Sequence, residues 1–346
     1  MSWKVLITAR GVQSAGEQAV ALLQKAGCEI VFPPRFGPLK ADELAPALTR
    51  VDAVLASLDD YSASLLSSSA AEKLKIIARW GVGYDSVDVA AATQNGIVVT
   101  YTPGLLDDAV ADYTFALLLA VARRTNEAHA AMQQGEWKPV WGADVGGKTL
   151  GIIGLGRIGK AVARRAAGFN MRILAHTPHP SPENEGIEFV PLARLLAESD
   201  FVSLHAALAP STRGMIGDAQ LRLMKPSAYL INTARGALVD EAALARALAE
   251  NRLAGAALDV YATEPLPSDS ALRAAPNLLL SPHQSSCARD TGERVSLAAA
   301  QAIVDLMNRK KPQNVLNPEV FESPGLRASV SAATNKNLGS DSAAGS

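Results

Sequence analysis

The stretch "KTLGIIGLGRIGKAVARRAAGF", residues 148–169, carries three glycines in the spacing G-x-G-x-x-G. A short apolar run, Thr149–Ile153, precedes the first glycine, and a helical pattern follows the last one. In such a turn Gly154 permits the tight bend, Gly156 lets a pyrophosphate reach the backbone, and Gly159 lets the helix pack closely on the strand. The amino terminus of the helix then offers unpaired N–H groups and a favourable dipole. This segment therefore predicts a dinucleotide-binding α/β unit.

Short apolar runs alternate with helical patterns on both sides of this turn. Such runs are typical of parallel sheets that carry helices on their faces. We expect strands at Lys4–Thr8, Glu29–Phe32, Ala53–Ala56, Leu74–Ala78, Ile97–Thr100, Thr149–Ile153, Arg172–Ala175, Phe201–Leu204, Ala228–Asn232, Ala256–Asp259 and Asn277–Leu280. The sequence therefore predicts an α/β protein with two Rossmann-like, doubly wound parallel-sheet domains.

Two helices bear on how these domains are arranged. The helix expected at Asp108–Arg124 is apolar on nearly every side, so it should be buried between domains or against a second chain. A final helix, Gly292–Asn308, has no place in a finished second sheet. Its return to the first domain would make that domain discontinuous in sequence. Residues 321–346 are rich in Ser, Ala, Gly and Asn, and we expect a disordered tail there.

Composition narrows the class of protein. The chain has 346 residues, of which 48% are hydrophobic, and this length suggests roughly two domains. A formal net charge of -1 gives no electrostatic footprint for nucleic acid or an anionic membrane. Two cysteines cannot form a disulfide framework and suit a reducing cytosol. The most apolar run, Phe115–Val121, is far shorter than the ~20 residues of a membrane span. We expect a cytoplasmic protein with no nucleic-acid or membrane partner.

The end of the strand after the glycine-rich turn bears on the choice of dinucleotide. About 20 residues beyond the turn, an NAD site usually presents Asp or Glu to the ribose hydroxyls. This chain reads "RILAHTPHP" and has Thr177 at that place, followed by Pro178 and His179 rather than an arginine. Loss of the carboxylate removes repulsion against NADP, while a neutral threonine can still hydrogen-bond NAD. The sequence permits either cofactor, with a slight preference for NADP and relaxed selectivity.

Three polar side chains follow strands of the second sheet, at the edge where open α/β sheets bind ligands. They are Arg235 in "NTARG", Glu264 in "LDVYATEP" and His283 in "LLLSPHQSS". A protonated His283 can donate to a carbonyl oxygen as hydride reaches the carbon, and a hydrogen bond to Glu264 would orient the imidazole. Arg235 offers paired donors to a carboxylate and stabilises charge on the carbonyl oxygen. The set predicts reduction of a 2-oxo acid.

These motifs resemble the D-isomer-specific 2-hydroxyacid dehydrogenases over almost everything up to about Pro318. The matching segments are "RWGVGYDSVDVAAATQNGI", "TLGIIGLGRIG", "MKPSAYLINTARGALVD", "ALDVYATEP" and "SPH", in the order and spacing of that family. The resemblance implies that the catalytic residues are Arg235, Glu264 and His283. It further implies a substrate-binding domain of residues 1–101 plus 285–320, a dinucleotide-binding domain of residues 102–284, and a homodimer through residues 108–147.

The resemblance and the turn together assign the binding residues. The resemblance places Asp259 near the nicotinamide and the backbone N–H groups of Val82 and Gly83 at the substrate carboxylate. We expect the cofactor to contact Gly154, Gly156, Arg157, Ile158, Gly159, Thr177, His205, Thr233, Ala234 and Asp259. We expect the substrate to contact Ser57, Arg79, Val82, Gly83 and Arg235. Asp107 departs from the Thr or Asn that relatives often carry near the cofactor. Neither H-E-x-x-H nor paired-cysteine spacing suggests a metal.

The substrate is less closely defined than the reaction. The segment "WKPVW", Trp137–Trp141, resembles the glyoxylate/hydroxypyruvate reductases, so these two 2-oxo acids are the first expectation. In that branch the second tryptophan can approach the active site of the neighbouring subunit; for Trp141, a packing role in the connector is the alternative. D-3-phosphoglycerate is the alternative substrate, with Arg79 and Lys40 as the available cations. A dinucleotide-sensing, corepressor-like binding protein is the non-enzymatic alternative.

Overall fold

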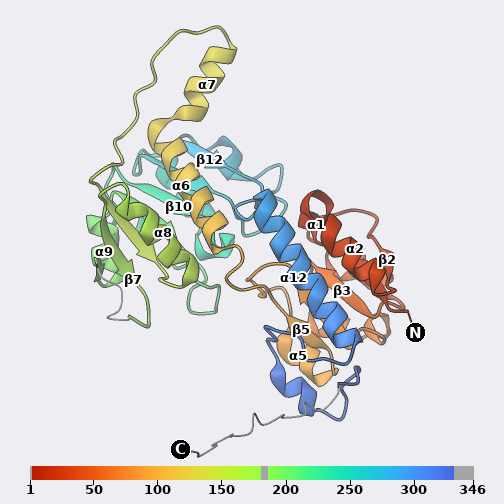
Figure 1. The fold of residues 1–346 in the computed structure, drawn as a ribbon. Coiled ribbons are helices and arrows are strands. Elements are labelled where there is room, and N and C mark those ends of the chain that lie inside the picture. Colours follow the sequence, from red (N-terminus) through yellow and green to blue (C-terminus); the bar gives the residue numbers. More distant parts are fainter. Residues whose placement is uncertain (1, 181–185, 331–346) are drawn as a thin grey trace, which may run out of the picture.

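The computed structural model describes residues 2–180 and 186–330, which form two parallel-sheet α/β domains (Figure 1). The first domain has a five-stranded sheet in the order β2-β1-β3-β4-β5. Its strands are β1 (Lys4–Ile7), β2 (Glu29–Val31), β3 (Ala53–Ala56), β4 (Ile76–Arg79) and β5 (Val98–Thr100). All of its strand pairs are parallel, so the loops that follow the strands gather at one edge of the sheet.

The second domain has a seven-stranded parallel sheet in the order β12-β11-β10-β9-β6-β7-β8. Its strands are β6 (Thr149–Ile153), β7 (Arg172–His176), β8 (Ile187–Phe189), β9 (Phe201–Leu204), β10 (Tyr229–Asn232), β11 (Gly255–Leu258) and β12 (Leu278–Leu280). From β6 the chain first runs towards β8 and then returns to the other side through β9. Such a reversal of strand order opens a crevice at the carboxyl ends of the strands, where ligands bind in open α/β sheets.

Helices cover both sheets. Those of the first half are α1 (Arg10–Ala15), α2 (Glu17–Lys25), α3 (Ala41–Leu48), α4 (Ala63–Leu66) and α5 (Val89–Gln94). Those that follow are α6 (Asp107–Arg123), α7 (Thr125–Gln133), α8 (Arg157–Ala167), α9 (Leu192–Glu198), α10 (Asp218–Leu221), α11 (Glu241–Ala249) and α12 (Arg289–Met307). The last helix returns to the five-stranded sheet and packs on α1, α2, β3 and β4 (Figure 1).

Alternating side chains of each central strand fill two apolar layers. In β1, Val5 and Ile7 pack in the layer that contains Ile303 of α12, whereas Leu6 packs in the opposite layer with Leu44 of α3. These residues are fully buried. Because successive side chains of a strand point to opposite faces, a strand covered on both sides must be apolar throughout. This requirement explains why the strands read as short, continuous apolar runs.

Three features differ from the expectations. The long helix α6 ends at Arg123, because the next residue, Arg124, has a left-handed φ of 51°; a separate helix α7 follows that the sequence did not predict. The edge strand β8 was also not predicted. The expectation of a disordered tail is wrong for residues 321–330, because Ala328 is buried and Leu326 packs on the core of the first domain. Residues 331–346, the rest of that expected tail, lie outside the described residues. Within the described chain, no helix is long and apolar enough to cross a membrane.

Candidate active site

The glycine-rich turn joins β6 to α8, and its three glycines meet different surroundings. A Cβ on Gly154, whose φ is 92°, would lie 2.5 Å from the Ala206 nitrogen, and one on Gly159 would overlap the Gly154 carbonyl oxygen. Among the described residues, a Cβ on Gly156 would meet nothing within 4 Å. Gly154 and Gly159 are therefore required by close packing, while Gly156 leaves open space at the amino terminus of α8. This cradle fits the pyrophosphate of a dinucleotide.

Two residues at neighbouring strand ends flank this turn. Thr177 directly follows β7 and is half-buried; its hydroxyl accepts a hydrogen bond from the His179 N–H at 3.4 Å. His205 follows β9, and its Nε2 lies 2.8 Å from the Ser203 hydroxyl. Burial lowers the pKa of His205 to about 3. The His205 ring is therefore neutral at physiological pH and adds no charge to the crevice.

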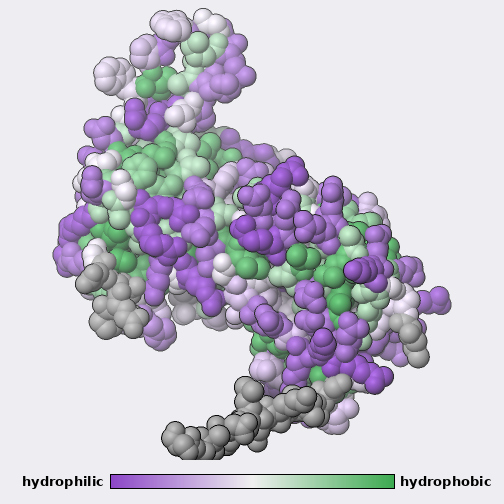
Figure 2. All heavy atoms as spheres, viewed as in Figure 1, coloured by the Kyte–Doolittle hydropathy of each residue, from purple (hydrophilic) through white to green (hydrophobic). Residues whose placement is uncertain are grey.

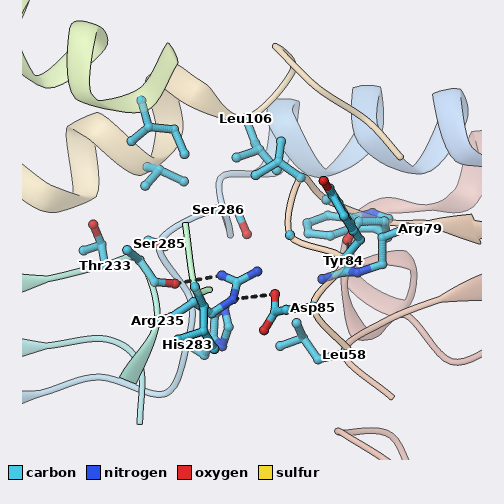
Figure 3. A pocket seen from close by; sticks show the side chains of 18 of the residues that line it. Leu58, Arg79, Tyr84, Asp85, Leu106, Thr233, Arg235, His283, Ser285 and Ser286 are labelled. Atoms are coloured by element: carbon cyan, nitrogen blue, oxygen red, sulfur yellow. Dashed lines mark hydrogen bonds and ion pairs between the residues drawn. The ribbon is translucent and has the colours of Figure 1, made fainter. Parts of the chain in front are cut away.

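A cavity of about 390 Å³ lies where loops of both domains meet. Ser57, Arg79 and residues 80–85 line it from the first domain. Figure 3 shows Arg79, Tyr84 and Asp85 among them. The residues that line it from other strand ends and from the turn include Ile158, His205, Thr233, Ala234, Arg235 and His283. A second cavity of about 270 Å³ adjoins it and shares Arg235 and His283, with Glu264 in its wall. The three side chains assigned to catalysis therefore meet in one place.

The expected contact between Glu264 and His283 is present. The Glu264 Oε2 lies 2.7 Å from Nδ1 of His283, and Oε1 accepts the Tyr261 N–H at 3.0 Å. Burial raises the pKa of Glu264, but the hydrogen bond and charge of His283 outweigh it and hold the pKa below its ordinary value. Because Nδ1 is engaged by the carboxylate, Nε2 is the imidazole nitrogen left for the cavity.

Asp259 holds the loop that carries His283. Its fully buried carboxylate accepts hydrogen bonds from the Ser281 hydroxyl at 2.6 Å, from the Gln284 N–H at 2.9 Å and from the Ser285 N–H at 2.8 Å. The backbone of His283 is held in the left-handed region, with a φ of 50°. The carboxylate is thus turned towards the loop, and the described lining of the cavity does not include Asp259. Its assignment as a nicotinamide contact stays a prediction.

Arg235 reaches across the cavity to a residue that sequence reasoning missed. Its Nε donates to Asp85 at 2.8 Å, and its Nη1 donates to the Ala234 carbonyl at 2.7 Å (Figure 3). A Cβ on Gly83 would overlap Nη2, so the guanidinium occupies the space that any other residue at this position would fill. Burial raises the pKa of Asp85, but the charge and hydrogen bond of Arg235 outweigh it and lower the pKa. Asp85 belongs to the segment "RWGVGYDSVDVAAATQNGI", which was quoted above for its resemblance to the family, and this was the only indication in the sequence that Asp85 lies at the site.

The remaining assigned residues divide between the cavity and its surroundings. Ser57, Val82, Ile158, Thr233 and Ala234 line the cavity. The described lining does not include Gly154, Gly156, Arg157, Gly159 or Thr177. Trp141 is 87% exposed, so the packing role in the connector is wrong for the single chain. Within residues 2–180 and 186–330, no group of three or more His, Cys, Asp or Glu side chains could hold a metal ion.

Comparisons with known proteins agree with this geometry. The sequence model described as "D-isomer specific 2-hydroxyacid dehydrogenase, NAD binding domain" matches residues 115–285. A glyoxylate reductase of Korarchaeum cryptofilum is 48% identical over 269 residues, which cover 75% of this chain and 81% of that protein. The chain belongs to the D-isomer-specific 2-hydroxyacid dehydrogenase family. It is an NAD(P)-dependent oxidoreductase.

Further relatives match over nearly their whole length. A glyoxylate reductase of Thermococcus gammatolerans is 41% identical over 341 residues, which cover 94% of this chain and all of that protein. A crystal structure of a Thermus thermophilus protein is similar with a TM-score of 0.82 and 40% identity, covering 90% of this chain and 99% of the other. The NADPH-dependent glyoxylate/hydroxypyruvate reductase of Sinorhizobium meliloti, in complex with NADP and malonate, has a TM-score of 0.80 and 29% identity, covering 96% and 100%.

The lowered pKa of Glu264 predicts a pH-dependent contribution to stability. A carboxyl whose pKa is lower in the folded state than its ordinary 4.5 stabilises the fold above that pH, and this contribution is lost as the pH falls through the folded-state value. We expect Glu264→Gln to lower the free energy of unfolding by about 1–2 kcal/mol at pH 7. The difference from wild type should shrink below pH 4.5.

Denaturant unfolding across a series of pH values measures this difference. Glu17→Gln, which removes an exposed carboxylate on α2, controls for the change in net charge. A wild-type advantage that persists at full size at acid pH would contradict the assignment of the stabilisation to the ionised Glu264.

Proposed function

We propose that the protein reduces glyoxylate or hydroxypyruvate with NAD(P)H to the corresponding 2-hydroxy acid, and that it catalyses the reverse oxidation of D-2-hydroxy acids. The observation that carries the proposal is the meeting of Arg235, Glu264 and His283 at one cavity beside the glycine-rich turn. The relatives named glyoxylate reductase support the choice of substrate. The malonate found with NADP in the Sinorhizobium meliloti enzyme supports a site for small carboxylates.

In this proposal each residue of the site has a defined role in substrate binding or proton transfer. The backbone N–H groups of Val82 and Gly83, together with Arg235, hold the substrate carboxylate. The glycine-rich turn would hold the dinucleotide, which would supply a hydride for the carbonyl carbon. His283 gives the proton on its Nε2 to the carbonyl oxygen, which becomes the hydroxyl group. Glu264 keeps the imidazole oriented and balances its positive charge before transfer, while Asp85 fixes the direction of the guanidinium.

The test is a single panel of 2-oxo acids with NADH and with NADPH. Glyoxylate, hydroxypyruvate, pyruvate, phenylpyruvate and 3-phosphohydroxypyruvate are incubated with the wild type and with His283→Ala, and loss of reduced cofactor is recorded. We expect turnover of glyoxylate or hydroxypyruvate by the wild type. In His283→Ala, kcat should fall by about 10²- to 10⁴-fold because the proton donor is missing.

Two further measurements make this panel decisive. Fluorescence titration should show nearly the same affinity of His283→Ala for the dinucleotide, and thermal unfolding should show an intact fold. Unchanged turnover in His283→Ala would remove it from proton transfer. A wild type that binds the dinucleotide but reduces none of the five acids would refute the proposed activity and favour the dinucleotide-sensing alternative.

We propose further that the enzyme uses both dinucleotides with a slight preference for NADP. The hydroxyl of Thr177 stands at the end of β7, beside the strand that leads into the glycine-rich turn, where an acidic residue would repel a 2′-phosphate. Thr177→Asp should lower the ratio of kcat/KM for NADPH to that for NADH by about tenfold or more, through charge repulsion. Thr177→Ser, which keeps the hydroxyl, is the control. An unaltered ratio in Thr177→Asp would show that residue 177 does not face the 2′ position.

We propose that two copies of the chain associate through residues 108–147. Every residue of α7 is at least partly exposed, and α7 projects beyond the body of the molecule (Figures 1 and 2). The connector that follows carries two large apolar side chains, Trp137 at 88% and Trp141 at 87% exposure. Two large aromatic side chains so exposed on a projecting arm are expected to be covered by a partner. The division into residues 1–101 plus 285–320 and residues 102–284 is likewise a proposal, which the packing of α12 on the first sheet supports.

Light scattering tests the dimer. The wild type should have twice the chain mass of 36.2 kDa, and the double variant Trp137→Glu/Trp141→Glu should shift towards the single-chain mass, because buried charge destabilises an apolar interface. Phe32→Glu, which changes an exposed aromatic residue of the first domain, is the matched control. A wild type of single-chain mass would refute the association.

A further inference from the structure

Arg79, the last residue of β4, carries a buried guanidinium with few partners. The residue is only 5% exposed, yet it lines the cavity. Its Nη1 donates to the Trp80 carbonyl, and among the described residues its Nε has no hydrogen-bond partner. The described carboxylates lie beyond ion-pair distance of this guanidinium, in contrast to Arg235, which is paired with Asp85. A buried cation without a carboxylate is costly, so a ligand that pairs with it would relieve a real penalty.

The two nearest acidic groups are already committed. The carboxylate of Asp59 is fully buried and accepts hydrogen bonds from the Leu39 N–H at 3.0 Å, from the Ser57 N–H at 3.2 Å and from the Thr8 hydroxyl. The carboxylate of Asp85 is bound by Arg235. Burial, and after it the positive charge of Arg235, lowers the pKa of Arg79 to about 10, so the guanidinium is still charged at neutral pH.

The position of Arg79 separates it from the catalytic residues. Its guanidinium lies over Gly81, where a Cβ would be 3.1 Å from Nη1, and it points into the cavity from the side opposite Arg235 (Figure 3). Trp80 beside it is fixed by a hydrogen bond of 2.9 Å from its indole N–H to Ser296 of α12. A substrate held by Arg235 and the 82–83 backbone would therefore extend its far end towards Arg79.

We propose that Arg79 is a second recognition point, which binds an oxygen carried on the third carbon of a 2-oxo acid. The oxygen belongs to a hydroxyl, carboxylate or phosphate group, all of which accept hydrogen bonds from a guanidinium. This inference rests on the proposed function, in which Arg235 takes the carboxylate next to the carbonyl group. Glyoxylate has no third carbon and pyruvate has only a methyl group there. Hydroxypyruvate and 3-phosphohydroxypyruvate carry an oxygen on the third carbon, which Arg79 would bind.

The experiment compares substrates within each variant. For wild type, Arg79→Met and Arg79→Gln, kcat/KM is measured with pyruvate, hydroxypyruvate and 3-phosphohydroxypyruvate. The ratio of hydroxypyruvate to pyruvate should fall about ten- to a hundredfold in both variants, the usual worth of a hydrogen bond to a charged group. The ratio of 3-phosphohydroxypyruvate to pyruvate should fall at least as far. Such ratios do not depend on the fraction of enzyme that is folded, so a destabilised variant still gives an answer.

A matched control and two contrary outcomes complete the test. Lys25→Met removes an exposed cation of α2 that lies outside the described lining of the cavity, and it should leave both ratios as in the wild type. Equal losses on all three substrates would mean that Arg79 acts on the common carboxylate or on the fold, and would overturn the proposal. Unchanged ratios would overturn it as well, while leaving the proposed function intact. Absence of any turnover in the wild type would instead refute the proposed function itself.

Discussion

The ion pair between Arg235 and Asp85 joins the two domains at the centre of the site. Arg235 follows β10 of the seven-stranded sheet, and Asp85 lies in the loop after β4 of the five-stranded sheet, 2.8 Å away. The contact depends on Gly83, because a side chain there would stand where Nη2 lies. Parallel sheets gather their loops at the carboxyl ends of the strands, so both partners come from equivalent places in their domains. The geometry of the cavity therefore depends on two sheets presenting these ends to each other.

Each domain supports its side of the cavity with a buried aspartate. Asp59, beyond the end of β3, accepts two N–H groups and a hydroxyl from the loops around it. Asp259, directly after β11, accepts two N–H groups and the hydroxyl of Ser281. Loops beyond a sheet edge lose the hydrogen bonds of the strands, and these carboxylates replace them. Several donors also offset the cost of burying the charge. The loops are thus fixed from behind, and their cavity faces stay free for Arg79, Arg235 and His283.

The sequence predicted the parts of the fold that are apolar throughout and missed those that are not. Strands β3, β6 and β9 begin and end at the predicted residues, because a strand buried on both faces is a short and mainly apolar run. Strand β8 has only three residues with a glutamate in the middle, and α7 has no buried face to impose a periodic pattern. The Arg235–Asp85 pair joins residues 150 positions apart, a relation that only the folded chain reveals.

The charges around the cavity form an arrangement suited to an anion. Among the guanidiniums that line it, that of Arg235 is balanced by Asp85 while that of Arg79 is not, and burial keeps His205 neutral. The carboxylate nearest to the imidazole of His283, Glu264, is held by that imidazole and by a backbone N–H, so its charge is directed away from the space in front of Nε2. Burial, and after it the positive charge of Arg235, lowers the pKa of Arg79, so a negative charge near this guanidinium is favoured. In the proposed binding mode the substrate carboxylate meets Arg235 and an oxygen at the far end meets Arg79, so an anion gains more from these charges than a neutral molecule of the same shape.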